Sequence, residues 1–242
     1  MIGMDDLPNT PPTRGARKTM IIGTVSGGYI DLLNPENHTV TLEDIYTGLR
    51  HTARWAGQTT SRWSVEEHSV MCANAFRGPA VGSLACLTHD IAEAVTGDIP
   101  NPIKKHLRVQ VEEGGPFLDF ETAVELPVRR ALLRVLFPDA RLRAAVNEQL
   151  DAGVYKPIDL VALHAEATRL RPRTDTSSYT KLPDGPDTQQ ALQDCTWVGF
   201  AGGLDTFEGT QAWFVEDADE ELDTFEGTLK WFVEDADEEL RL

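Results

Sequence analysis

The first hydrophobic positions of the chain lie in two short runs that turn residues separate. Thr19–Val25 and Tyr29–Leu33 are β-branched or apolar, and the sequence Ser-Gly-Gly at 26–28 divides them. Two such runs around a glycine-rich turn are typical of a β-hairpin. The polar, proline-containing segment 1–18 before them predicts a flexible arm.

After the hairpin, apolar residues recur at the spacing of helices. Two helix starts carry a capping pattern, in which a Ser or Thr and an acidic residue three positions later satisfy each other's backbone N–H groups. Thr41–Asp44 predicts a helix that runs to about Trp55, and Ser64–Glu67 predicts a second helix with His68 just inside it. Helical spacing predicts three later helices, which are Phe117–Phe137 with a bend at Pro127, Ala140–Leu150 and Ile158–Leu170.

A third helix, between these two groups, has two chemically different sides. Its apolar stripe consists of Leu84, Leu87, Ile91 and Val95. Its other side carries Cys86, His89, Asp90 and Glu93. Residues 19–172 are therefore predicted to be mainly α, a helical bundle with a small N-terminal β-hairpin.

The chain ends in an acidic direct repeat. Residues 173–203 predict a linker or extension, and Leu204–Glu221 is then repeated as Leu222–Glu239 with changes only at Gln211/Leu229 and Ala212/Lys230. Residues 204–242 hold 14 of the 39 acidic residues and two basic ones, so this tail carries −12 of the formal charge of −17. Two copies are too few for a solenoid, which favours a solvated tail. The alternative is that Trp213–Val215 and Trp231–Val233 form short strands or anchors on a partner or a neighbouring subunit.

Length and composition restrict the class of protein. The 242 residues, 41% hydrophobic and 25% charged, suit one globular domain with extensions. No apolar run approaches about 18 residues and no signal peptide opens the chain, which predicts a cytoplasmic protein without a membrane partner. The negative charge disfavours nucleic acid as a partner. The three cysteines lack CxxC spacing, which argues against a disulfide framework or a thiolate zinc site.

Two histidines and two aspartates stand out as candidate metal ligands. His68, the pair His89-Asp90, and Asp159 combine imidazoles with carboxylates, which suits a divalent transition metal ion such as Mn, Co, Fe, Ni or Zn. His89 and Asp90 face away from the apolar stripe of their helix, and Asp159 borders the stripe of the last helix. A carboxylate at the edge of a buried face needs a compensating partner, and a cation is a good one.

The order of these residues, with the segments around them, resembles the HD-domain phosphohydrolases. The similar segments are WSVEEHSV at 63–70, LTHDIAEAVTGDIPNPIK at 87–104 and YKPIDLVALHAEATRL at 155–170, together with SGGYIDLLNPENHTVTLEDIYTGLRHTARWAG upstream. They are similar to the deoxynucleotide-hydrolysing branch, which includes bacterial 5′-deoxynucleotidases and phage-type dATP triphosphohydrolases. The resemblance covers about residues 24–172 and implies an HD-domain helical bundle.

The resemblance also implies a role for each matching residue. His68, His89, Asp90 and Asp159 would bind the metal. Two carboxylates would be catalytic, Glu93 by handling the proton of the attacking water or leaving oxygen and Asp98 near the sugar and the scissile phosphate. Substrate would be bound by Arg54, Trp55, Lys104 and Lys156. Arginine and lysine suit phosphoryl transfer, which needs positioning and charge neutralisation. The alternative for Trp55 is packing in the core, and the alternative for Lys104 and Lys156 is a solvated surface position.

The implied reaction is hydrolysis of a deoxynucleotide with one protein-held metal ion. Between Asp90 and Asp159 the only histidine is His106, so ligands for a second protein-held ion are missing, and further divalent ions would arrive with the substrate phosphates. The leading hypothesis is a dATP-type triphosphohydrolase that releases deoxynucleoside and triphosphate and controls a nucleotide pool. The alternatives are a deoxynucleoside 5′-monophosphatase and a non-catalytic nucleotide sensor or interaction protein. The resemblance further implies a homo-oligomer, in a host cytoplasm if the origin is a phage.

Overall fold

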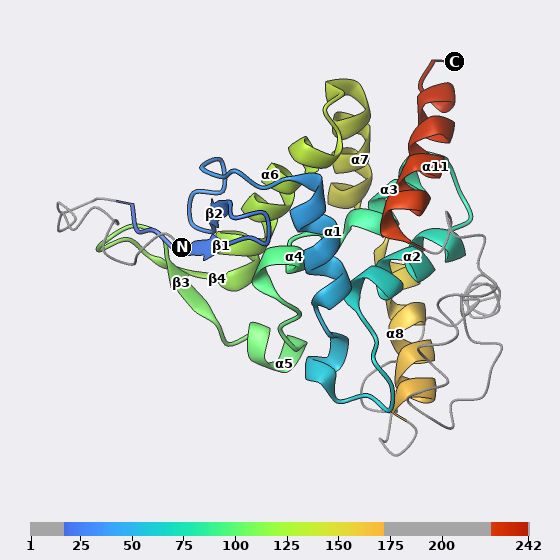
Figure 1. Cartoon of the computed structure of the whole chain (residues 1–242). Helices are drawn as coiled ribbons and strands as arrows, with labels where there is room; N and C mark the ends of the chain where they lie inside the picture. The colour runs from blue at the N-terminus through green and yellow to red at the C-terminus, as the bar shows by residue number, and fades with distance from the viewer. Residues whose placement is uncertain (1–16, 172–223, 242) are drawn as a thin grey trace.

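The computed structural model describes residues 17–171 and 224–241, and it is mainly helical with a small antiparallel hairpin near the N-terminus. Figure 1 shows helices packed around one another, with the two short hairpins together at one side. The predicted fold class is therefore confirmed. Most of the predicted arm, the linker 173–203 and the first repeat copy lie outside the described residues.

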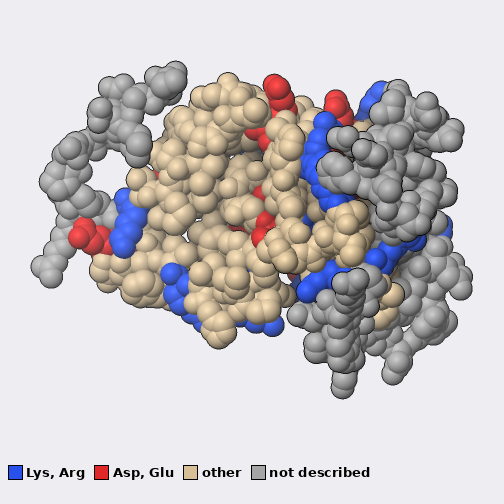
Figure 2. Space-filling model, turned by 60° about the horizontal axis from the view of Figure 1, so that its bottom comes forward, with Lys and Arg blue, Asp and Glu red and all other residues tan. Residues whose placement is uncertain are grey.

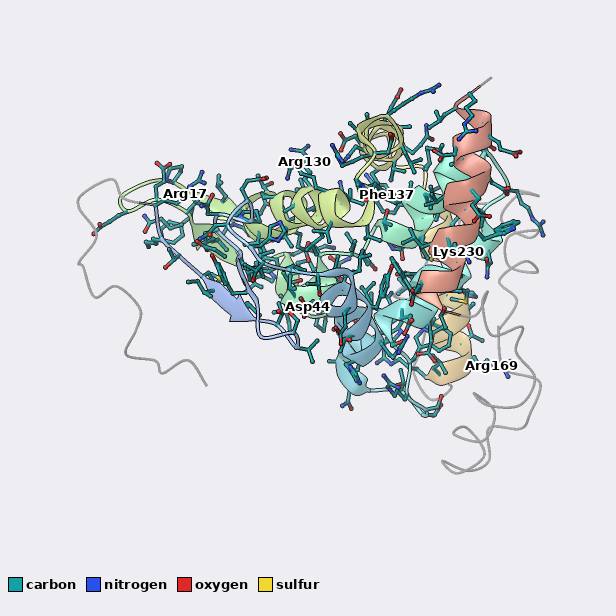
Figure 3. All side chains as sticks on the ribbon, turned by 45° about the horizontal axis from the view of Figure 1, so that its top comes forward. Arg17, Asp44, Arg130, Phe137, Arg169 and Lys230 are labelled. Atoms are coloured by element: carbon teal, nitrogen blue, oxygen red, sulfur yellow. The ribbon has the colours of Figure 1, made fainter. Side chains whose placement is uncertain are left out.

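The N-terminal hairpin and the helix after it are tied together by one carboxylate. Strands β1 (Ile21–Gly23) and β2 (Tyr29–Asp31) pair antiparallel, with Ile22 opposite Ile30. Asp44, in the first turn of α1 (Leu42–His51), accepts hydrogen bonds from the backbone N–H of Ser26 in the hairpin turn and from the Ser26 hydroxyl, both at 2.8 Å. Figure 3 labels Asp44 at this junction. The same carboxylate completes the predicted capping box with Thr41.

Helix α3 (Ala80–Thr88) lies at the centre of the bundle. Every residue of this helix is buried, including Cys86 on the side that was predicted to differ from the apolar stripe. Its neighbours are α2 (Val65–Ala75), α7 (Ala140–Ala152) and α11 (Phe225–Glu239). Helix α8 (Lys156–Leu170) packs against α2 on the other side (Figure 1). These helices position the candidate site.

Two predicted helices are shorter than expected. The helix from Thr41 ends at His51, and Arg54–Gly57 form a separate 3-10 turn. The third helix ends at Thr88, residues 89–92 form a turn, and α4 (Glu93–Thr96) follows. Helix α5 (Asn101–Lys104) then leads out of the bundle.

The prediction of one helix over Phe117–Phe137 is wrong in its first part. Phe117–Asp119 is strand β4, which pairs with β3 (Arg108–Gln110) across a turn that contains Gly114 at φ +75°. A π-helical turn at Glu121–Glu125 leads into α6 (Leu126–Leu136). Proline has no N–H and is tolerated in the first turn of a helix, so Pro127 begins α6 instead of bending a longer helix.

The solvated-tail interpretation is wrong for the second repeat copy. Residues 225–239 form α11, whose Phe225, Leu229, Phe232 and Ala236 belong to the main hydrophobic core. The four apolar positions follow helical spacing, and the acidic residues lie between them on the outer side. The alternative of short strands at Trp231–Val233 is also wrong.

Two further expectations concern cysteines and membranes. Cys72 and Cys86 are buried free thiols, as predicted, and Cys195 lies outside the described residues. Within 17–171 and 224–241, the helices are all too short or too polar to cross a membrane.

Candidate metal centre

Four side chains from three separate parts of the chain meet beside the N-terminal half of α2. His68 lies in α2, His89 caps the C-terminus of α3, Asp90 follows it in the turn, and Asp159 lies in the first turn of α8. The capping box of Ser64 and Glu67 fixes where α2 begins and so sets the direction of His68. The structure therefore brings together all four residues predicted as ligands.

The four candidate ligand atoms form a compact cluster. His68 Nε2 lies 3.3 Å from His89 Nε2 and 3.2 Å from Asp159 Oδ1. His89 Nε2 lies 3.2 Å from Asp90 Oδ2 and 3.8 Å from Asp159 Oδ1, and His68 Nε2 lies 3.7 Å from Asp90 Oδ2. Ligands at ~2.1 Å from a tetrahedral ion would be ~3.4 Å apart, and at cis positions of an octahedral ion ~3.0 Å apart. The observed spacings agree with either geometry.

Both imidazoles are oriented by their other nitrogen. His68 Nδ1 lies 2.6 Å from Glu166 Oε1, and His89 Nδ1 lies 2.6 Å from the backbone carbonyl of Cys86. Because a carbonyl oxygen only accepts and a carboxylate accepts when ionised, each Nδ1 carries the hydrogen. Each Nε2 is then able to offer its lone pair to the centre, which is the arrangement of metal-binding histidines in proteins.

Glu166 is a buried carboxylate that the sequence analysis did not identify. Besides His68, it accepts from Trp55 Nε1 at 2.9 Å and from Arg54 Nε at 3.3 Å. Burial alone would raise the pKa of Glu166, but the charges of Arg54 and His68 lower it to about 2. Glu166 is therefore ionised and aligns both a ligand and the neighbouring guanidinium. The signal in the sequence was its position two helical turns after Asp159, on the same face of α8.

The protonation of the centre is set by its own charges. Burial lowers the pKa of His89, but Asp90 and Asp159 outweigh it and raise that pKa well above 6.5. Burial would raise the pKa of Asp90, but His89 and Arg54 lower it below 3.8. Arg54 contributes through Nη1, which lies 3.1 Å from Asp90 Oδ2. The carboxylates thus favour a proton on His89, and that proton must leave before His89 Nε2 offers its lone pair to a cation.

A thiol lies beside the histidines. His68, Cys72 and His89 form a buried group that could hold a metal ion, because their ligand atoms all lie within 4.8 Å of one another. Cys72 Sγ is 3.6 Å from His68 Nε2, and burial raises the pKa of this thiol well above 9.0. The absence of CxxC spacing argued against a thiolate zinc site, whereas the position of Cys72 adds a soft ligand to the group that could hold a metal ion.

A cavity of about 210 Å³ adjoins the centre. Figure 2 shows one face of the molecule hollowed near its middle, with acidic side-chain atoms visible inside the hollow. The charged residues that line the cavity are five carboxylates and two cations, namely Asp90, Glu93, Glu121, Glu125, Asp159, Lys104 and Arg129. The lining is therefore acidic, and an anionic ligand would need additional positive charge there.

Glu93 and Lys104, both predicted site residues, face each other in this cavity. Lys104 Nζ lies 3.5 Å from Glu93 Oε1 and 2.7 Å from Glu125 Oε1. Burial and the negative charge of Asp90 raise the pKa of Glu93 well above 4.5, so its carboxyl tends to retain a proton. Glu93 Oε2 is buried and makes no hydrogen bond among the described residues.

Trp55 and Asp98 are joined in a strained turn. Trp55 and Ala56 adopt φ of +59° and +52°, a left-handed conformation that costs a non-glycine residue about 1–3 kcal/mol. Asp98 accepts a hydrogen bond from the backbone N–H of Trp55 at 2.9 Å. Asp98 and Glu166 thus hold the backbone and the indole of this turn, which places Trp55 next to Arg54.

One predicted cation does not line the cavity, and one cation that was not predicted does. Lys156 is exposed at the start of α8 and does not line the cavity, whereas Arg129 of α6 does. The side chain of Arg129 is only 9% exposed, and its Nε makes no hydrogen bond among the described residues. Arg129 was hidden in the sequence because it lies among apolar residues of α6. Tyr155, which also lines the cavity, stacks on His89 with ring centroids 5.0 Å apart.

Comparison with known proteins gives relatives without a stated activity. No family model matches the chain. It is 34% identical over 171 residues to an uncharacterized protein of Rhodobacter capsulatus, RCAP_rcc00048, and this match covers 61% of the chain and 85% of the relative. It is also 34% identical over 88 residues to the uncharacterized protein YfdR of Escherichia coli K12, which covers 36% of the chain and 47% of YfdR.

Proposed function

The chain belongs to the same family as the Rhodobacter capsulatus protein, and we propose that it is a metal-dependent HD-domain phosphohydrolase that acts on a deoxynucleoside triphosphate. The observation that carries the proposal is that Nε2 of His68 and Nε2 of His89 each lie 3.2 to 3.8 Å from carboxylate oxygens of both Asp90 and Asp159. Two imidazoles and two carboxylates suit a divalent first-row ion, which would be held by these four residues. Such an ion supplies positive charge that neutralises phosphate oxygens and lowers the pKa of water.

The remaining side chains support hydrolysis at phosphorus next to this centre. Arg54 is aligned by Glu166 and Asp90, and in the proposed reaction its guanidinium would donate to a phosphate oxygen. In the proposed reaction a water oxygen bonds to the α-phosphorus and the bond to the 5′ oxygen breaks. Glu93, whose pKa is raised by burial and by Asp90, gives a proton to the departing 5′ oxygen and regains one from the attacking water. The products are deoxynucleoside and triphosphate.

The cavity supports a phosphate chain as the enclosed part of the substrate. Its volume of about 210 Å³ is below the ~300–1,000 Å³ of sites that enclose a drug-sized ligand. Lys104 and Arg129 provide cations in its wall, and the five carboxylates favour further divalent ions that arrive with the phosphates. These features favour a triphosphate, with dATP as the first substrate to test.

A deoxynucleoside 5′-monophosphatase is the second candidate, and the position of Lys156 favours it. The triphosphate hypothesis used Lys104 and Lys156 as a pair, but Lys156 is exposed outside the cavity. A monophosphate needs fewer cations, so the centre with Arg54 and Lys104 would suffice. Trp55, held by Glu166, would contact the nucleoside in either case.

Product analysis distinguishes these candidates. The protein is incubated with Mn²⁺ or Co²⁺ and with dNTPs, dNMPs and their ribose counterparts, and the products are separated by chromatography. Triphosphate released from a dNTP supports the proposal, and phosphate released only from monophosphates supports the second candidate. Glu93→Gln is the matched control, since it should bind metal but lose turnover. Binding of nucleotide without turnover in the metal-loaded wild type contradicts both candidates and supports a nucleotide sensor.

A further inference from the structure

Helix α11 fills a groove between α2 and α3. Its buried side consists of Phe225, Thr228, Leu229, Phe232 and Ala236, and none of these is more than 7% exposed. Figure 1 shows the helix lying along α3 and crossing the start of α2. On its outer side Lys230, labelled in Figure 3, is exposed. The repeat sequence therefore has one face built for this groove.

Polar contacts fix the register of α11 at both ends. The backbone N–H of Phe225 donates to Glu66 Oε1 at 3.3 Å, and Phe225 lies 5.9 Å from the ring of Tyr46. At the other end, Glu239 Oε1 accepts from the backbone N–H of Ala80 at 3.0 Å, which satisfies one of the open N–H groups at the start of α3. Thr224 caps α11 itself by accepting from Gly227.

The first repeat copy carries nearly every group that the groove contacts. Four of the five groove residues are identical in the first copy, and so are the cap and the terminal glutamate. In the same order as Phe225, Thr228, Phe232, Ala236, Thr224 and Glu239, these are Phe207, Thr210, Phe214, Ala218, Thr206 and Glu221. The one changed position on the buried side is Gln211, where the second copy has Leu229. The other change, Ala212 for Lys230, falls on the exposed side.

We infer that the α2–α3 groove is a docking site for the repeat sequence and that the first copy, Leu204–Glu221 of the same chain, is its second ligand. Treated as a random coil, a chain of the length of 172–206 would span roughly 30 Å, about the diameter of a small domain, which is long enough for the first copy to reach the groove. Tethering in one chain gives millimolar effective concentrations, which favours this copy over one from another molecule. Exchanging a buried leucine for glutamine favours the second copy by on the order of 10- to 100-fold.

The two copies would then be interchangeable supports for the same pair of helices. Helix α2 carries His68, and His89 follows directly on α3. Whichever copy docks holds these two helices together, and the other copy keeps an apolar face available. The inference does not depend on the reaction at the metal centre, because it concerns only the groove and the repeat.

Charge substitutions in each copy test the inference. Hydrogen exchange by mass spectrometry separates the copies, because Gln211-Ala212 and Leu229-Lys230 give peptides of different mass. In Phe225→Asp, we expect protection to move from 225–239 to 207–221 and the melting temperature to fall by a few degrees, the cost of glutamine in place of leucine. Phe207→Asp alone should change neither, and the double variant should lose protection in both copies and melt far lower. Adding Gln211→Leu to Phe225→Asp should raise the melting temperature again.

Three results would overturn the inference. The first is that Phe225→Asp is as unstable as the double variant, or fails to fold. The second is that Gln211→Leu leaves the Phe225→Asp variant unchanged. The third is that protection of 207–221 in Phe225→Asp appears only at high protein concentration together with dimers, which would make a second chain the source of the helix.

Discussion

Replacement of Glu166 by glutamine should weaken metal binding without changing any of the four proposed ligands. The wild-type carboxylate accepts from His68 Nδ1 at 2.6 Å and thereby keeps the hydrogen on that nitrogen. An amide that retains its oxygen for Trp55 and Arg54 turns its NH₂ group towards His68, so two donors face each other. The imidazole must either tolerate this contact or move its hydrogen to Nε2, the atom that faces the centre.

The size of the effect follows from the bond that is lost. A hydrogen bond to a charged group contributes about 1.5–3 kcal/mol, and loss of such a partner of a metal-binding histidine weakens metal affinity by about 10- to 100-fold. The two estimates agree, since each factor of ten corresponds to about 1.4 kcal/mol. The buried Arg54 keeps its contact with Asp90 at 3.1 Å, so we expect the variant to fold.

Calorimetric titration of metal-free protein with Mn²⁺ or Co²⁺ measures the change directly. At a fixed metal concentration well above Kd, the metal-induced stabilisation should also fall by about 1.4–2.7 kcal/mol. Glu66→Gln is a matched control, because Glu66 of α2 is buried like Glu166 but pairs with Arg50 at 2.9 Å instead of with a histidine. Equal Kd values for wild type and Glu166→Gln would refute the argument that Glu166 sets the orientation of His68.

Four shorter predictions concern pH, packing and the cavity. The pKa of Asp44 is lowered from 3.8 to about 2 because, against the effect of burial, it accepts four hydrogen bonds from the hairpin turn and the helix cap. The stability that the ionised Asp44 contributes is complete above pH 3.8 and is lost as the pH falls through about 2. Between these pH values the free energy of unfolding should therefore fall less steeply in Asp44→Asn than in the wild type, as acid unfolding curves would show. Gly48→Ala should lower the melting temperature despite the better helix propensity of alanine, because a Cβ atom there would overlap the backbone of Ala94. The raised pKa of His89 means that an ion displaces a proton, so metal affinity should rise with pH, and titrations in buffers of different ionisation enthalpy should show proton release. Arg129→Met should raise KM for a triphosphate about tenfold or more while leaving metal affinity unchanged, and equal KM values would remove Arg129 from the substrate site.

Local signals in the sequence determined the starts of the helices and the set of candidate ligands. Thr41 with Asp44, and Ser64 with Glu67, form the predicted capping boxes because the partners are three residues apart and need no distant contact. The hairpin at Ile21–Asp31 follows from its glycine-rich turn in the same way. His68, His89, Asp90 and Asp159 were recognisable because their order and neighbouring segments resemble a known family.

Tertiary structure decided which polar groups are buried and what they face. Glu166 is 98 residues from His68 in the chain, and Arg129 became a cavity residue only because α6 packs beside the site. Lys156, which was predicted to bind substrate, does not line the cavity because its position at the start of α8 is exposed. The second repeat copy looked like a solvated acidic tail because its charges outnumber its apolar residues. It is part of the core because helical spacing gathers Phe225, Leu229 and Phe232 on one side, and only the groove between α2 and α3 shows that this side has a partner.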